Sequence, residues 1–163
     1  MNDILVFGVG NPDRGDDALG LAVARALAPS AGAGVRVIEQ RGDAADLIDR
    51  LAGTGAAVLV DAAVSGAAPG SFRRIDLQHE TLPAAWFACS THGLGLATAI
   101  GLAHALGNLP PRCIVYAVEG SDFAPGAALS GCASATIPRV VDAIIRDIAQ
   151  FRAALAPNET AGS

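Results

Sequence analysis

The residues of this chain best suited to chemistry are two aspartates and a histidine, Asp17, Asp61 and His92, with Glu119 as a fourth candidate. Carboxylate oxygens and an imidazole nitrogen form a borderline ligand set that suits nickel or zinc. These residues are far apart in the sequence, and no HExxH motif joins two of them. Only the fold could gather them, so the residue types alone indicate a candidate metal site and no more.

Each of these residues also has a structural interpretation. Asp17 could cap a helix. Asp61 could cap a turn, but it directly follows apolar residues, and a buried carboxylate is costly unless a cation lies near, which favours a functional role. A helix N-terminus disfavours protonated His92, and a neutral imidazole is the form that binds metal. We interpret His79 and His104 as structural or solvent-facing.

Hydrophobic patterning predicts the elements that must position these residues. Apolar runs predict buried strands, and apolar residues at helical spacing predict helices in the segments between them. The expected strands are residues 4–9, 35–39, 56–60, 71–76 and 113–118. The expected helices follow residue 17, open at residue 43, run from about residue 92 to 106, and start near Pro138, a favoured first-turn residue. This alternation predicts an α/β fold with a mostly parallel sheet of about five strands and helices on both faces.

In such a sheet, ligands bind beyond the carboxyl ends of the strands. Asp17 follows the first strand, Asp61 directly ends the third, and His92 begins the third helix. Glu119 ends the last strand. The topology therefore predicts that the candidate residues converge at this edge of the sheet.

Composition narrows the class of protein. The 163 residues suit one domain, which we place at 1–156, with a polar tail at 157–163 that we expect to fray. The net charge is -5, every basic residue is Arg, and no basic stripe exists, so nucleic-acid binding is not expected.

Three cysteines without a CxxC pair suit a reducing cytosol, and the N-terminus lacks a basic signal-peptide region, so we expect a cytoplasmic protein. Residues 81–111 carry no formal charge, but their His, Gly and Pro residues favour a packed helix over a membrane span.

A dinucleotide site is the competing interpretation of the first loop. Gly8 and Gly10 follow the first strand, and Glu39 ends the second. However, Asp13 replaces the third glycine of the motif, and the neighbouring aspartates would repel a pyrophosphate. Nucleotide binding is therefore disfavoured.

The same residues carry a resemblance to a known family. Residues 8–11 (GVGN) and 15–20 (GDDALG) resemble the opening motif of the hydrogenase maturation proteases, endopeptidases that process nickel-iron hydrogenase large subunits. Residues 61–62 (DA) and 91–96 (THGLGL) resemble the family's Asp after the third strand and its His before a helix. The resemblance extends over about residues 3–150, with the motifs in matching order, and it implies a three-layer α/β/α sandwich.

The resemblance implies that Asp17, Asp61 and His92 bind nickel already inserted in the precursor of a hydrogenase large subunit. A short C-terminal peptide is then removed. A nickel-bound water or one of the carboxylates could activate the attacking water. The substrate would supply the nickel as the recognition element, and the free enzyme would hold no tightly bound metal.

The sequence departs from the family pattern at two places. Residues 39–43 (EQRGD) stand where the family usually has Asp-Gly-Gly-Thr, and Asp17 stands where some members have Glu.

Two alternative functions remain open. A zinc-dependent hydrolase would use the same three ligands but hold its metal without substrate. A non-catalytic nickel-sensing maturation chaperone of the same fold would bind the precursor and leave its tail intact.

Overall fold

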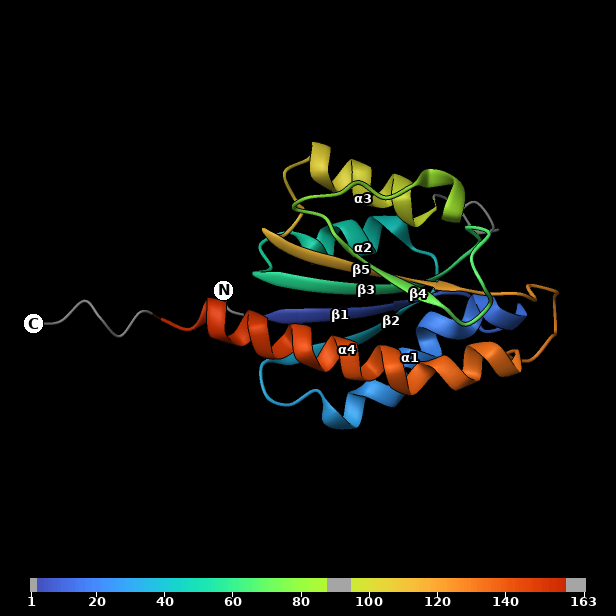
Figure 1. Ribbon diagram of the computed structural model, residues 1–163. Coiled ribbons are helices and arrows are strands. Elements are labelled where there is room, and N and C mark those ends of the chain that lie inside the picture. The colour runs from blue at the N-terminus through green and yellow to red at the C-terminus, as the bar shows by residue number, and fades with distance from the viewer. Residues whose placement is uncertain (1–2, 88–94, 158–163) are drawn as a thin grey trace, which may run out of the picture.

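The computed structural model describes residues 3–87 and 95–157, which form one central sheet covered by helices on both faces (Figure 1). The strands are β1 (Ile4–Val9), β2 (Val35–Gln40), β3 (Ala56–Ala63), β4 (Phe72–Asp76) and β5 (Arg112–Glu119). The helices are α1 (Leu19–Leu27), α2 (Ala44–Leu51), α3 (Leu96–Ala105) and α4 (Gly131–Leu155). The element order and the predicted α/β/α sandwich are confirmed.

The sheet has the strand order β2-β1-β3-β5-β4. All neighbouring strands pair in parallel except β4, which pairs antiparallel with β5 at one edge. The central strand β3 is buried along its whole length, including Asp61, as expected for a strand with helices on both faces of its sheet.

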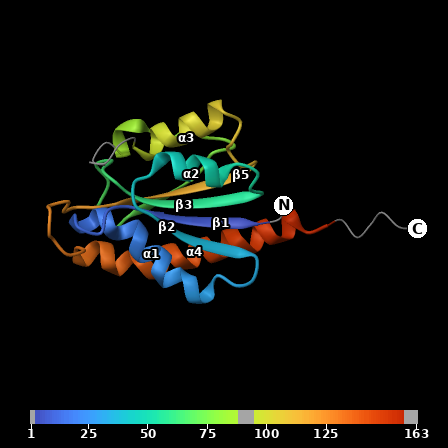
Figure 2. The same ribbon diagram turned by 180° about the vertical axis from the view of Figure 1, so that it is seen from behind.

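Two apolar cores lie on the two faces of the sheet. Helices α1 and α4 cover one face, and α2 and α3 cover the other, as both ribbon views show (Figure 2). Alternate residues of each strand point to opposite faces. On β3, Val58 and Val60 join the core beneath α1 and α4, while Ala57 and Leu59 join the core beneath α2 and α3.

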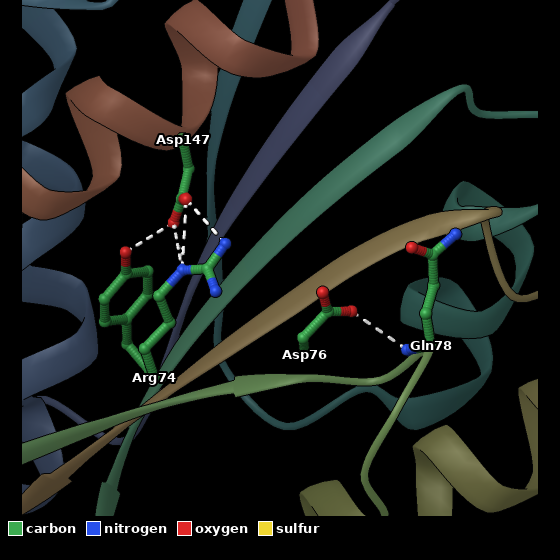
Figure 3. Close-up of polar contacts among 5 residues, drawn as sticks. Arg74, Asp76, Gln78 and Asp147 are labelled. Atoms are coloured by element: carbon green, nitrogen blue, oxygen red, sulfur yellow. Dashed lines mark hydrogen bonds and ion pairs between the residues drawn. The ribbon is translucent and has the colours of Figure 1, made fainter. Parts of the chain in front are cut away.

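The edge strand β4 illustrates the same alternation. Arg74 lies on the α4 face, where Nη2 donates to Asp147 Oδ1 at 2.8 Å (Figure 3). The hydroxyl of buried Tyr116 also donates to Asp147. Although β4 is an edge strand, Arg74 forms an ion pair with Asp147 of α4 and does not simply face solvent.

Three boundaries differ from the sequence-based prediction by more than one residue. Strand β3 continues three residues past Val60 because β5 pairs with it as far as Ala63. Helix α1 is preceded by a 3-10 turn, Gly15–Ala18. Helix α4 begins at Gly131 and not near Pro138, because Ser130 caps it by accepting a hydrogen bond from the N–H of Ala133.

A short element precedes the third helix. Ala84–Phe87 forms a 3-10 turn between β4 and α3. Helix α3 begins at Leu96, and the predicted start at His92 lies outside the described residues, as does most of the predicted tail. No helix in the described part of the chain is long and apolar enough to cross a membrane.

Candidate active site at the carboxyl end of the sheet

Asp61 lies inside the central strand and not after its end, contrary to the prediction. It pairs in register with Ala117 of β5 and is 7% exposed. Its neighbours Leu59 and Ala63 belong to the core beneath α2 and α3, so Asp61 faces that side of the sheet. The carboxylate is thus held by a fully paired strand, which fixes its position.

Asp17 reaches the same region from the 3-10 turn before α1. Its N–H donates to the carbonyl of Arg14 at 3.0 Å, and its carbonyl accepts from the N–H of Asn11 at 3.1 Å. Two backbone contacts therefore anchor this turn to the loop after β1. Asp17 is 9% exposed.

Glycines allow the turn and α1 to pack directly onto the sheet. A β-carbon on Gly20 would lie 2.2 Å from the carbonyl oxygen of Val9 and 2.4 Å from that of Val60. A β-carbon on Gly10 would lie 2.0 Å from the carbonyl oxygen of Asp17. Real β-carbons do not approach so closely, so only glycine lets the turn that carries Asp17 sit beside the strand that carries Asp61.

The two carboxylates influence each other. Burial raises the pKa of Asp61 well above its ordinary value, and the negative charge of Asp17 raises it further, against a smaller lowering effect from the N–H of Ala62. The fold therefore brings together two acids that are far apart in the sequence, as the topology predicted.

Both carboxylates line one pocket of about 550 Å³, a volume that includes space open to solvent. Its walls come from the loop after β1, the loop after β2 and the first turns of α2 and α3. Residues 40–43, the loop that departs from the family motif, form one wall, and Gln40 Nε2 holds it by donating to the carbonyl of Asp43 at 2.8 Å.

His92, the third predicted ligand, lies outside the described residues. Leu96, four residues later in the sequence, lines the pocket of Asp17 and Asp61. Among residues 3–87 and 95–157, no three His, Cys, Asp or Glu side chains are grouped closely enough to hold a metal ion. The metal-ligand set therefore stays a prediction.

Glu119 and the other two histidines do not join this pocket. The Glu119 carboxylate accepts hydrogen bonds from the N–H groups of Ser65 and Gly66 and from the Ser65 hydroxyl, at 2.7 to 3.1 Å. Its role is to hold the loop after β3. His79 and His104 are exposed, as expected.

Asp16 is a structural residue that the sequence analysis overlooked. It is fully buried, and its carboxylate accepts from the N–H groups of Ser121, Asp122 and Ser130 at 2.8 to 3.2 Å. Burial disfavours the charge, but the hydrogen bonds from Ser121, Ser130 and Asp122 outweigh it and lower the pKa of Asp16. Asp16 thereby joins the turn of Asp17 to the loop before α4. Because Asp16 and Asp17 are adjacent in the sequence, the residue types alone do not indicate which of the two is structural.

The dinucleotide interpretation finds no support in this geometry. The chain itself fills the space above Gly10, where the carbonyl of Asp17 packs. Glu39 forms an ion pair with Arg25 at 2.7 Å.

Comparison with known proteins agrees with the resemblance. A sequence model of the hydrogenase maturation protease family matches residues 22–147. A sequence comparison with curated proteins gave no significant match.

Solved structures share the fold. The hydrogenase maturating endopeptidase HybD from Escherichia coli is 23% identical with a TM-score of 0.77, and 91% of this chain aligns with 93% of that one. The [NiFe] hydrogenase maturation protease HycI from Thermococcus kodakarensis is also 23% identical, with a TM-score of 0.71 and the same coverage, 91% and 93%. An endopeptidase from Escherichia coli is 24% identical with a TM-score of 0.79, and 91% of this chain aligns with 93% of it.

Proposed function

The chain belongs to the hydrogenase maturation protease family and is a maturation endopeptidase, and on this basis we propose that it removes a short C-terminal peptide from the nickel-loaded precursor of a hydrogenase large subunit. The substrate brings the nickel, and Asp17, Asp61 and His92 bind it. Because the family is one of proteases, the chaperone interpretation is set aside.

One observation carries the proposal: two carboxylates from distant segments line one pocket at the carboxyl end of the sheet. Burial and mutual repulsion both disfavour a charged Asp61 beside Asp17. A divalent cation entering with the substrate would relieve both costs, since opposite charge favours ionised carboxylates. A cationic partner would therefore account for the two carboxylates being held close together in a buried position, which is unfavourable in the free protein.

The proposed reaction adds water across one peptide bond. The hydroxyl joins the carbonyl carbon, the C–N bond breaks, and a proton passes to the leaving amine. Nickel held by the substrate and gripped by Asp17, Asp61 and His92 would fix the precursor so that the bond to be cut lies beside the acidic groups. Such positioning alone supplies a large rate advantage.

The same arrangement suits a free enzyme without a resident metal. Two carboxylates and one imidazole, without a thiolate or a fourth protein donor, make a weak site. The precursor completes the coordination, so cleavage is coupled to correct metal loading. We place the reaction in the cytoplasm, where cysteine usage suggested the chain resides.

The test is to mix the purified protein with nickel-loaded precursor and follow the intact mass of the precursor. The wild type should release a C-terminal peptide, while Asp17→Asn and His92→Ala should leave the precursor at full length. Asp13→Asn is the matched control, because Asp13 lies in the same loop, is exposed and does not line the pocket. Wild-type processing by Asp17→Asn or by His92→Ala would remove that residue from the proposed ligand set.

A further inference from the structure

A second pocket lies beside the candidate site on the same face of the sheet. It has a volume of about 750 Å³, including space open to solvent. Its lining comes from the end of β3, the loop that follows, β4, β5 and the 3-10 turn before α3. Ala63 and Ala117 form its floor, and their small side chains leave the space above the sheet unfilled.

The strand register connects the two pockets. Asp61 of β3 pairs with Ala117 of β5, and Ala117 pairs with Arg73 of β4. The three residues therefore form one row across adjacent strands and share a face. Asp61 lines the first pocket, while Ala117 and Arg73 line the second. Two strand spacings separate the backbones of Asp61 and Arg73, about 10 Å.

Two contacts position the side chain of Arg73, but the described residues leave most of its N–H donors available. Its guanidinium lies over the ring of Trp86, 5.3 Å from the ring centroid, and Nη2 donates to Glu80 Oε1 at 2.7 Å. Of the five N–H donors of a guanidinium, the described residues accept only from Nη2. The side chain is 57% exposed. Arg73 thus offers preorganised donors at the pocket.

We infer that Arg73 binds a carboxylate of the substrate's C-terminal peptide in this second pocket, about three residues from the bond that is cut. The inference rests on the proposed function. An extended peptide covers about 3.3–3.6 Å per residue, so roughly three residues span the distance from Asp61 to Arg73. The nickel-bearing body of the precursor occupies the first pocket, so the peptide leaving it is the part that reaches the second.

The carboxylate has two sources, the terminus of the tail or an acidic side chain within it. A guanidinium recognises both in the same way, through charge-assisted and often bidentate hydrogen bonds. Glu80 shows that the position of Arg73 is compatible with a bound carboxylate. Since exposed ion pairs contribute little to stability, replacing Arg73 should leave the fold intact.

The kinetic test uses Arg73→Gln, Arg73→Lys and the control Arg36→Gln with nickel-loaded precursor. Arg36 is an exposed Arg on β2, at the opposite edge of the sheet. We expect Arg73→Gln to raise KM by up to about fivefold, the effect of losing an ion pair at a largely exposed guanidinium, with kcat little changed. Arg73→Lys should recover part of the loss, and Arg36→Gln should match the wild type.

Changes to the precursor identify the source of the carboxylate. In one arm the C-terminus of the precursor is amidated, and in the other the acidic residues of the tail are replaced by their amides. The arm that removes the bound carboxylate should raise KM for the wild type but not for Arg73→Gln. Failure of both arms, or an unchanged KM for Arg73→Gln while the wild type cleaves normally, overturns the inference and leaves the proposed function standing.

A binding measurement tests this inference independently of cleavage. Trp86 is the only tryptophan of the chain and lines the second pocket, so its fluorescence responds to a ligand bound there. A synthetic peptide of the tail sequence should shift the emission of the non-cleaving Asp17→Asn variant, and Arg73→Gln in that background should weaken the binding. An unchanged emission at saturating peptide overturns the inference, whether or not the wild type cleaves precursor.

Discussion

Burial raises the pKa of Asp61 and the negative charge of Asp17 raises it further, although the two residues come from a turn before α1 and from β3. This repulsion does not stabilise the free protein. Because Asp61 titrates in the folded state, its effect on the free energy of unfolding can be measured without any substrate.

Asp61→Asn should make the free protein more stable than the wild type at neutral pH. Burial and Asp17 raise the folded-state pKa of Asp61 above its unfolded value of about 4, so the folded state binds the proton more tightly. Wild-type stability therefore falls, relative to the variant, as pH rises from about 4 through the raised pKa. Asp61→Ala should likewise leave neutral-pH stability unchanged or raised.

Urea unfolding of the wild type and Asp61→Asn across this pH range checks the difference, because all other groups are common to both proteins. A wild type that gains stability relative to the variant with rising pH would show that Asp61 is a structural anion.

Gly20→Ala should destabilise the protein and reduce processing. Its β-carbon would enter the space of the Val9 and Val60 carbonyl oxygens, at 2.2 and 2.4 Å, and force α1 away from the sheet. Overpacking of this kind costs about 1–3 kcal/mol. Because α1 continues from the turn of Asp17, the displacement also moves that carboxylate from Asp61.

Gly101→Ala is the matched control, since it is also a helical glycine but has nothing within 4 Å of its added β-carbon. It should raise the unfolding free energy by about 0.5–1 kcal/mol. Thermal unfolding and precursor processing are measured together. Equal stability changes for the two variants would contradict the close packing of α1.

Arg74→Met should lower the unfolding free energy by roughly 1.5–3 kcal/mol, the worth of hydrogen bonds to a charged group. Asp147 is only 5% exposed and would lose its ion partner, retaining the hydroxyl of Tyr116. The double variant Arg74→Met/Asp147→Leu should recover part of the loss, because no unpaired buried charge remains.

Arg50→Met is the control for this pair. Arg50 and Asp46 form an exposed pair one helical turn apart, worth about 0.3–0.5 kcal/mol. Denaturant unfolding of the three variants and the wild type gives the comparison. A loss for Arg74→Met no greater than for Arg50→Met would mean that the Asp147 contact contributes little.

The sequence predicted the sheet because buried parallel strands have uninterrupted apolar runs, as in Ile4–Val9. It misplaced the start of α4 because Pro138 suits a first turn, while the capping Ser130 lies in a Gly- and Pro-containing stretch that resembles loop. The end of β3 was misplaced for a related reason. An aspartate normally terminates an apolar run, and only the pairing with β5 shows that Asp61 lies within the strand.

The convergence of Asp17 and Asp61 followed from topology, since Asp17 follows β1 and Asp61 lies near the carboxyl end of the neighbouring parallel strand β3. The roles of Asp16 and Arg73 could not be obtained in this way. Asp16 acts through hydrogen bonds to residues more than 100 positions away, and Arg73 through a row set by strand register. Neither relationship leaves a local pattern in the sequence.

The most direct test of the proposal compares nickel-loaded with nickel-free precursor, together with elemental analysis of the purified protein. We predict that only the nickel-loaded precursor is shortened at its C-terminus and that the free protein carries little or no zinc. Asp17→Asn should abolish the shortening without loss of fold. One tightly held zinc per chain, with equal cleavage of nickel-free precursor, would contradict substrate-supplied nickel and favour a zinc-dependent hydrolase.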